Sequence, residues 1–289
     1  MQKVTVIPYA KKIGVANIIP RLVDWLEKNN VEMAIPESDA AELGIPAFGV
    51  AKDKLFDGSD LVITLGGDGT TLRAVKLLEE RDIPILGINL GEMGFLMWTM
   101  PDQMEDVLER IQDGRFAVEQ RRMLKARIML ADGQRIERLA LNDILVGRDE
   151  FGRLIKLDLL VNGVLFCQYA ADGLVAATPT GSTAYAFSAG GPIIAPATDV
   201  FLTTPICPHS LNDRALIFSA GDRVTIKPLK LGKTGKVGIS VDGRVIEDLP
   251  DMIFIDICLA DHRCSFISID GPGFYEALNK KLKKWLSLR

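Results

Sequence analysis

The sequence lacks the features that mark several large classes of protein. It has only four cysteines, none spaced as a C-x-x-C pair, and only two histidines, so neither a disulfide scaffold nor a zinc site is indicated. No apolar run reaches the roughly 18 residues that a membrane span requires, and the first residues lack the layout of a secretory signal. Lys and Arg number 34 against 38 Asp and Glu, so the basic excess common in nucleic-acid-binding proteins is missing. We therefore expect a cytoplasmic protein with no nucleic-acid and no membrane partner.

The chain does have the length and composition of a globular protein. With 289 residues, 48% of them hydrophobic and 25% charged, it is long enough for about two domains with apolar cores. In the first third, short apolar runs at 4–8, 61–65 and 85–88 alternate with stretches of helical periodicity. Strand, helix and strand in this order predict a Rossmann-like parallel α/β domain with right-handed crossovers.

Beyond about residue 122 the pattern becomes that of an antiparallel β domain. Two-residue turn signals lie between strand-like segments at Asp132-Gly133, Asn162-Gly163 and Asp242-Gly243. They predict hairpins in a β-sandwich-like domain. Residues 274–288 return to helical spacing with an apolar stripe, and we expect this terminal helix to pack back on the first domain. The predicted division is 1–120 plus 272–289 for the α/β domain and 121–271 for the β-rich domain.

One short motif carries most of the chemistry, Gly66-Gly67-Asp68-Gly69, which follows a buried strand and opens a helix. Its glycines allow backbone N–H groups to approach an anion at the helix N-terminus, which suits a nucleotide polyphosphate. A carboxylate beside bound phosphate costs Coulomb energy, so Asp68 is expected either to hold Mg²⁺ or to accept a proton from an attacking hydroxyl. The alternative is an ordinary tight turn in which Asp68 is a local N-cap.

Two further segments favour the binding of a nucleoside. Residues 171–192 are rich in glycine and hydroxyl side chains and include Asp172, and the stretch 157–213 contains no Lys or Arg. Because polyphosphate is normally held with cationic help, this segment is expected to bind sugar hydroxyls, an amide or a ring. Asn142-Asp143 offers donors and acceptors for a purine edge and a ribose diol. Both patterns also occur in ordinary loops and turns.

Together these motifs resemble the NAD kinase family over most of the chain. The matching pieces are Gly66-Gly67-Asp68-Gly69-Thr70, Asn89-Leu90-Gly91 with Gly94-Phe95-Leu96, Asn142-Asp143, Asp172-Gly173-Leu174, Thr178 to Tyr185, and Pro208-His209-Ser210-Leu211. The first piece is shared with diacylglycerol-type lipid kinases and phosphofructokinases. The Asn-Asp element and the segment from Thr178 to Tyr185 are specific to NAD kinases.

The resemblance implies a role for each matching residue. Asp68 would be the proton acceptor for the adenosine ribose 2′-hydroxyl, with Gly69 beside the ribose and diphosphate. The other implied nucleotide contacts are Gly66, Gly67, Arg73 facing the phosphates, Asn142 and Asp143 at the adenine and a ribose, Arg153, Asp172 at the nicotinamide end, Thr180, Thr183, Ala184, Tyr185, Ala186, Phe187 and Ser188 as the pocket wall, Cys207 through its backbone, and Arg244. Two positions depart from the family: Ala170 stands where relatives often carry a basic residue, and Arg244 where many carry Gln.

The activity implied by this resemblance is transfer of the γ-phosphate of ATP to NAD⁺, which gives NADP⁺. Mg²⁺ would accompany the donor, polyphosphate is a possible alternative donor, and the protein would form a homodimer or homotetramer. A lipid kinase is the alternative enzyme, but it is expected to carry a Gly-Thr-x-Asn-Asp element that this chain lacks. A non-catalytic dinucleotide-binding sensor, with Asp68 merely as a cap, is the alternative outside enzymes.

Overall fold

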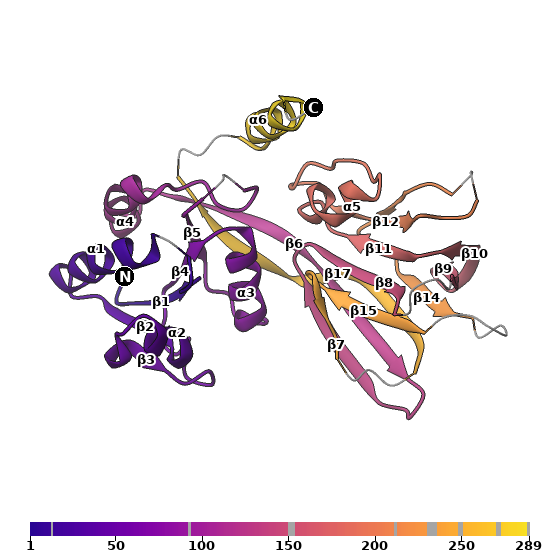
Figure 1. Ribbon diagram of the computed structural model, residues 1–289, viewed down its shortest axis with the longest axis horizontal. Coiled ribbons are helices and arrows are strands. Elements are labelled where there is room, and N and C mark those ends of the chain that lie inside the picture. Colours follow the sequence, from indigo (N-terminus) through magenta and orange to yellow (C-terminus); the bar gives the residue numbers. More distant parts are fainter. Residues whose placement is uncertain are drawn as a thin grey trace. The chain divides into compact units, whose positions relative to one another are not determined.

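The chain folds into two compact units, formed by Met1–Gln120 with Cys264–Arg289 and by Arg121–Arg263 (Figure 1). The computed structural model describes residues 1–12, 14–91, 94–149, 154–210, 213–229, 236–247, 251–269 and 273–287. No helix among these residues is long and apolar enough to cross a membrane.

The first unit is a parallel α/β fold, as the alternating pattern predicts. Its strands run in the order β3-β2-β1-β4-β5, and every one of these pairings is parallel. The strands are β1 (Lys3–Pro8), β2 (Glu32–Pro36), β3 (Gly49–Val50), β4 (Leu61–Gly66) and β5 (Ile85–Asn89). The helices are α1 (Val15–Lys28), α2 (Glu37–Glu42), α3 (Asp68–Leu78), α4 (Met104–Gln112) and α6 (Phe274–Ser287), with short 3₁₀ turns at Pro46–Phe48 and Pro101–Gln103.

Helices cover both faces of this sheet (Figure 1). Alternate residues of β1 and β4, such as Val4 and Ile63, pack with the apolar faces of α1 and α4 in one buried cluster. On the other face, the Thr64 and Thr71 hydroxyls lie 3.2 Å apart and join β4 to α3. The strand order reverses direction between β1 and β4, because the chain first adds β2 and β3 on one side of β1 and then β4 and β5 on the other. Open α/β sheets bind ligands at the carboxyl ends of the strands at such a switch point.

The second unit is built from antiparallel strands in two sheets. One sheet has the order β13-β12-β11-β8-β15-β16, and the other pairs β10 with β9, β9 with β14, β14 with β17, and β17 with β6, which also pairs β7. The strands are β6 (Ala117–Leu130), β7 (Arg135–Ala140), β8 (Asp143–Arg148), β9 (Ile155–Val161), β10 (Val164–Ala171), β11 (Gly173–Ala177), β12 (Val200–Ile206), β13 (Leu216–Ser219), β14 (Val224–Pro228), β15 (Val237–Val241), β16 (Arg244–Val245) and β17 (Met252–Ser268). A 3₁₀ turn (Gly181–Thr183) and α5 (Tyr185–Ser188) complete it. The part of β6 before Arg121 and the part of β17 after Arg263 belong to the first unit.

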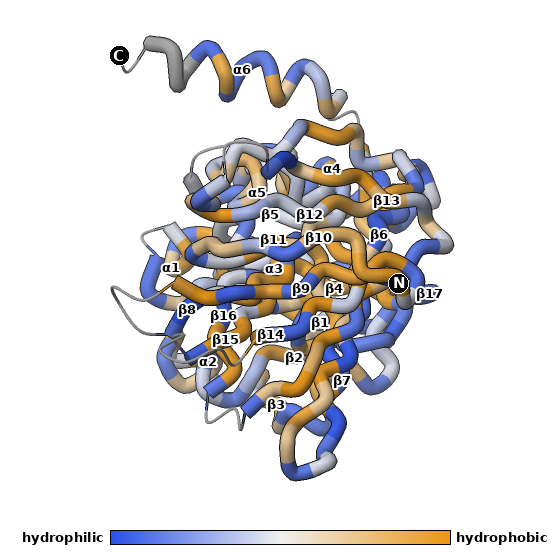
Figure 2. Tube along the Cα trace, turned by 90° about the vertical axis from the view of Figure 1, so that its right-hand side faces the viewer, coloured by the Kyte–Doolittle hydropathy of each residue, from blue (hydrophilic) through white to orange (hydrophobic). Residues whose placement is uncertain are grey.

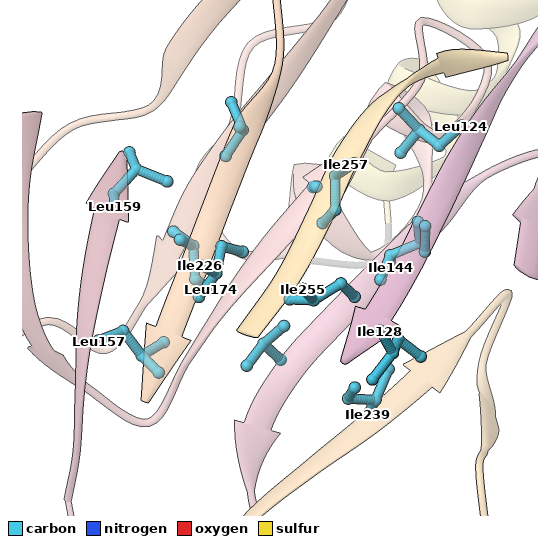
Figure 3. Close-up of a cluster of buried hydrophobic side chains, with 14 of the residues drawn as sticks. Leu124, Ile128, Ile144, Leu157, Leu159, Leu174, Ile226, Ile239, Ile255 and Ile257 are labelled. Carbon is cyan, nitrogen blue, oxygen red and sulfur yellow. The ribbon is translucent and has the colours of Figure 1, made fainter. Parts of the chain in front are cut away.

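The three turn signals all form hairpins, so this part of the prediction is confirmed. The turns join β6 to β7, β9 to β10 and β15 to β16. At Asn162-Gly163 and Asp242-Gly243 both residues have positive φ, which is the conformation that a two-residue type I′ turn needs. The apolar core lies between the two sheets and takes residues such as Leu124, Ile144 and Ile257 from both of them (Figure 3).

The terminal helix α6 belongs to the first unit, as expected. Its polar and apolar residues alternate along the helix (Figure 2). The ring centroids of Phe274 and Phe95 lie 6.3 Å apart, the Lys281 ammonium lies 4.0 Å from the centroid of the Phe95 ring, and Ala277 is buried. The helix therefore contacts the segment that follows β5. The last predicted helical residue, Leu288, lies outside the described residues.

Candidate active site

The glycine motif lies at the carboxyl end of β4, where α3 begins. Gly67 is extended, with φ −143° and ψ −175°, and its carbonyl accepts the N–H groups of Thr70 and Thr71 at 2.8 and 3.3 Å. Among the described residues, no protein acceptor bonds the N–H groups of Asp68 and Gly69. A Cβ on Gly66 would overlap the Thr70 side chain, so this tight entry into the helix requires glycine. Anion binding by these amides at the start of α3 stays a prediction.

The Asp68 carboxylate is held by backbone amides from a distant part of the chain. Oδ2 accepts the Phe95 N–H at 2.9 Å and Oδ1 accepts the Leu96 N–H at 3.3 Å. A Cβ on Gly94 would overlap this carboxylate, which explains the glycine there. The N-cap of α3 is Gly67, and Asp68 bonds outside its own helix, so the alternative of a local N-cap is wrong. The side chain is half-buried and kept in one orientation, as a proton acceptor requires.

Arg73 lies on α3, but its guanidinium is occupied within the first unit. Nη2 lies 2.6 Å from Asp39 Oδ2, and Nη1 donates to the Pro8 carbonyl at 3.1 Å. The side chain therefore ties α3 to α2 and to the end of β1. The contact between Arg73 and phosphate stays a prediction.

In the second unit, Asn142-Asp143 is positioned by a residue that the sequence marks only as a hairpin turn. The Asp242 carboxylate accepts the N–H groups of Leu141, Asn142 and Asp143 at 2.9, 2.7 and 3.1 Å. The Asp143 side chain is buried and accepts the backbone N–H of Tyr185. Burial, and then the neighbouring Asp242 carboxylate, raise the pKa of Asp143 to about 7. Burial also raises the pKa of Asp242.

The segment predicted as a pocket wall packs directly on this Asn-Asp pair. The Thr178 hydroxyl donates to the Leu141 carbonyl at 2.6 Å and accepts the Gly181 N–H at 3.0 Å. Gly181 approaches Asn142 so closely that an added Cβ would overlap the Asn142 backbone. Thr180 and Ala186 are buried, Tyr185 and Ser188 are exposed, and Thr183, Ala184 and Phe187 are half-buried. The structure therefore brings the wall and the Asn-Asp pair together.

The absence of Lys and Arg from 157–213 does not leave this region without cations. Arg148 Nη1, from β8, lies 3.1 Å from Asp172 Oδ1, and Arg121 Nη1 lies 3.5 Å from the Thr180 hydroxyl. Neighbouring strands thus place cationic side chains beside the segment, and its binding of sugar hydroxyls, an amide or a ring stays a prediction. A count of residues along one segment cannot detect these side chains.

The remaining predicted residues are placed as follows. The Asp172 N–H donates to the Ile206 carbonyl at 3.0 Å, and the next residue, Cys207, is exposed with φ 44°. Arg244 is exposed and pairs with Val241 across the β15–β16 hairpin. Arg153 lies outside the described residues. Among the described residues, no group of three or more His, Cys, Asp or Glu could hold a metal ion.

The raised pKa of Asp143 predicts a particular dependence of stability on pH. In the unfolded chain this group loses its proton near its ordinary pKa of about 3.9, whereas in the folded protein it does so at about 7. Between these values the folded state binds more protons, so the free energy of unfolding should fall with rising pH by at most about 1.4 kcal/mol per pH unit. The stabilisation is complete below the unfolded pKa and is lost as pH rises through 7.

As pH rises from about 5 to about 8, the wild type should lose the free energy of unfolding that comes from protonated Asp143, whereas Asp143→Asn has no such proton to lose. The free energy of unfolding of the variant should therefore rise relative to that of the wild type over this range, as measured by urea unfolding at each pH. Asp261→Asn, which removes an exposed carboxylate from the same unit, should leave the pH dependence unchanged. Identical pH dependence in the wild type and Asp143→Asn would show that Asp143 titrates normally.

The fold and this geometry define a class of protein, one with a parallel α/β unit and an antiparallel β unit in which a glycine turn at the carboxyl end of a parallel strand holds a fixed carboxylate. The family models for the ATP-NAD kinase N-terminal domain and C-terminal domain match residues 6–116 and 141–269. The NAD kinase of Desulforamulus reducens is 35% identical to this chain, over 99% of this chain and 98% of the relative. The NAD kinase of Natranaerobius thermophilus is 36% identical, over 98% of each chain.

Solved structures agree with these matches. A yeast NADH kinase complexed with NADH superposes with a TM-score of 0.91 at 26% identity, covering 98% of this chain and 88% of that one. An NAD kinase from Archaeoglobus fulgidus in complex with ATP gives a TM-score of 0.73 at 26% identity, covering 93% and 94%. The chain belongs to the NAD kinase family, and the predicted resemblance, fold and enzyme class are confirmed.

Proposed function

We propose that the protein transfers the γ-phosphate of ATP to the 2′-hydroxyl of the adenosine ribose of NAD⁺, which yields NADP⁺ and ADP. The observation that carries this proposal is the Asp68 carboxylate, held by the Phe95 and Leu96 amides at the start of α3. The yeast relative holds NADH and the Archaeoglobus relative holds ATP, which supports a dinucleotide acceptor and a nucleotide donor.

In the proposed reaction the ribose 2′-oxygen forms a bond to the γ-phosphorus while the bond from that phosphorus to the β–γ bridging oxygen breaks. The bonding electrons leave with ADP, and the 2′-hydroxyl proton passes to Asp68. Phosphoryl transfer depends mainly on positioning and charge neutralisation, so Asp68 would take the proton late, as the new bond forms. Mg²⁺ would enter with ATP as part of the donor substrate.

The other proposed contacts hold the two substrates. Asn142 and Asp143 would bind the adenine and a ribose, and the buried Asp143 could donate or accept a hydrogen bond near neutral pH because its pKa is about 7. Asp172, oriented by Arg148, would meet the nicotinamide end. The remaining proposed contacts are Gly66, Gly67, Gly69, Arg73, Arg153, Thr180, Thr183 to Ser188, Cys207 and Arg244. On the family resemblance alone, we also propose a cytoplasmic homodimer or homotetramer.

The test is incubation of the purified protein with MgATP and NAD⁺, with NADP⁺ measured by an NADP-specific dehydrogenase. The expected result is NADP⁺ formation that depends on both substrates. Parallel reactions with NADH as acceptor and polyphosphate as donor define the substrate range. Saturable NAD⁺ binding without NADP⁺ formation would instead identify a dinucleotide-binding sensor and overturn the proposal.

A further inference from the structure

Lys12 places an ammonium group against the glycine motif. Its Nζ lies 3.4 Å from the Gly66 carbonyl oxygen, which ends β4. A Cβ built on Gly91 would lie only 2.7 Å from that nitrogen, and one built on Gly67 would lie 3.9 Å from it. The amine therefore lies among three glycines, and any side chain at residue 91 would displace it.

The backbone around Lys12 fixes this position. After β1, the Tyr9 N–H donates to the Leu65 carbonyl at 2.9 Å, and the Lys12 N–H donates to the Tyr9 carbonyl at 2.8 Å. The segment thus follows the end of β4 and makes a turn before α1. Since β1 and β4 flank the switch point of the sheet, Lys12 lies where open α/β sheets bind their ligands.

The charges around the glycine motif also favour a cation at this position. Asp68 brings a negative charge to a site meant for phosphate, and this charge must be offset for an anion to bind well. Arg73 has its guanidinium on Asp39 and Pro8. Within the described parts of the chain, no carboxylate forms an ion pair with Lys12. Its ammonium group donates to the neutral carbonyl of Gly66.

We propose that Lys12 binds the phosphate groups of the nucleotide donor, together with the amides at the start of α3. This inference rests on the proposed function, because it assigns the donor to the glycine motif. A lysine acts on phosphate as a compact point charge with three donors, so it can follow the phosphates without a fixed fork geometry. Its contribution should grow with the number of phosphates and vanish for a nucleoside.

The test measures binding of adenosine, ADP and ATP, with Mg²⁺ and without NAD⁺, by calorimetry on the full chain. Lys12→Met keeps most of the side-chain length and removes the charge. Lys11→Met is the matched control, because Lys11 is the exposed neighbour of Lys12 in the sequence. We expect Lys12→Met to weaken ATP binding by about 10- to 100-fold, ADP binding by less, and adenosine binding not at all. Lys12→Arg should recover most of the ATP affinity.

Steady-state kinetics supply an independent measurement. In Lys12→Met the KM for ATP should rise by a similar factor while the KM for NAD⁺ stays unchanged. Unchanged ATP affinity would overturn the inference, as would an equal loss for adenosine and ATP, since that indicates a structural role. The proposed function is judged separately: a wild-type protein that binds ATP through Lys12 but forms no NADP⁺ would overturn that function and leave the donor site standing.

Discussion

The variant Asp68→Asn is expected to lose at least about 10²-fold in turnover number while keeping most of its affinity for NAD⁺. An amide has the size of the carboxylate and can still accept one of the two N–H groups of Phe95 and Leu96. It cannot accept the proton of the 2′-hydroxyl, so the loss should fall on the chemical step. The measurement is kcat from NADP⁺ formation, with NAD⁺ affinity from calorimetry.

A matched control for this variant is Asp53→Asn, which makes the same chemical change at an exposed position of the first unit. Its turnover should equal that of the wild type. Near-normal turnover in Asp68→Asn would show that Asp68 is not the proton acceptor. A loss of melting temperature in parallel with the loss of turnover would instead point to the Phe95–Leu96 contacts as its main role.

The second large effect is expected for Gly181→Ala. The added Cβ would overlap the carbonyl group and Cα of Asn142, so the backbone must move to admit it. Overpacking of this kind costs about 1–3 kcal/mol. Here it would also separate the wall segment from Asn142-Asp143, so we expect the KM for NAD⁺ to rise by about tenfold or more. Melting temperature and the KM for NAD⁺ are the two measurements.

The control is Gly221→Ala in the same unit, where a Cβ meets no atom within 4 Å and φ is not positive. This variant should retain wild-type stability and kinetics. If Gly181→Ala behaved like Gly221→Ala, the contact between the wall segment and Asn142-Asp143 would contribute neither to stability nor to NAD⁺ binding. An equal rise in the KM for ATP and for NAD⁺ would contradict the assignment of this contact to the acceptor.

The features that the sequence predicted correctly depend on neighbouring residues. Asn162-Gly163 and Asp242-Gly243 form hairpins because both positions of a type I′ turn need positive φ, which these residue types tolerate. The alternation of apolar runs and helical periods correctly predicted the parallel sheet, because strands that are buried on both faces are mostly apolar. The glycine motif also lies at a strand-to-helix junction as expected.

The sequence by itself therefore determined the two kinds of domain, the hairpins and the identity of Asp68 as the acid of the glycine motif. Only the tertiary structure decided what surrounds these residues. It joins Asp68 to Phe95 and Leu96, Asn142 to Asp242, and Asp172 to Arg148. Lys12 reaches Gly66 in the same way, across the β1–β4 pairing. These partners are set by strand order and register, and a local pattern contains no information on which distant strands become neighbours.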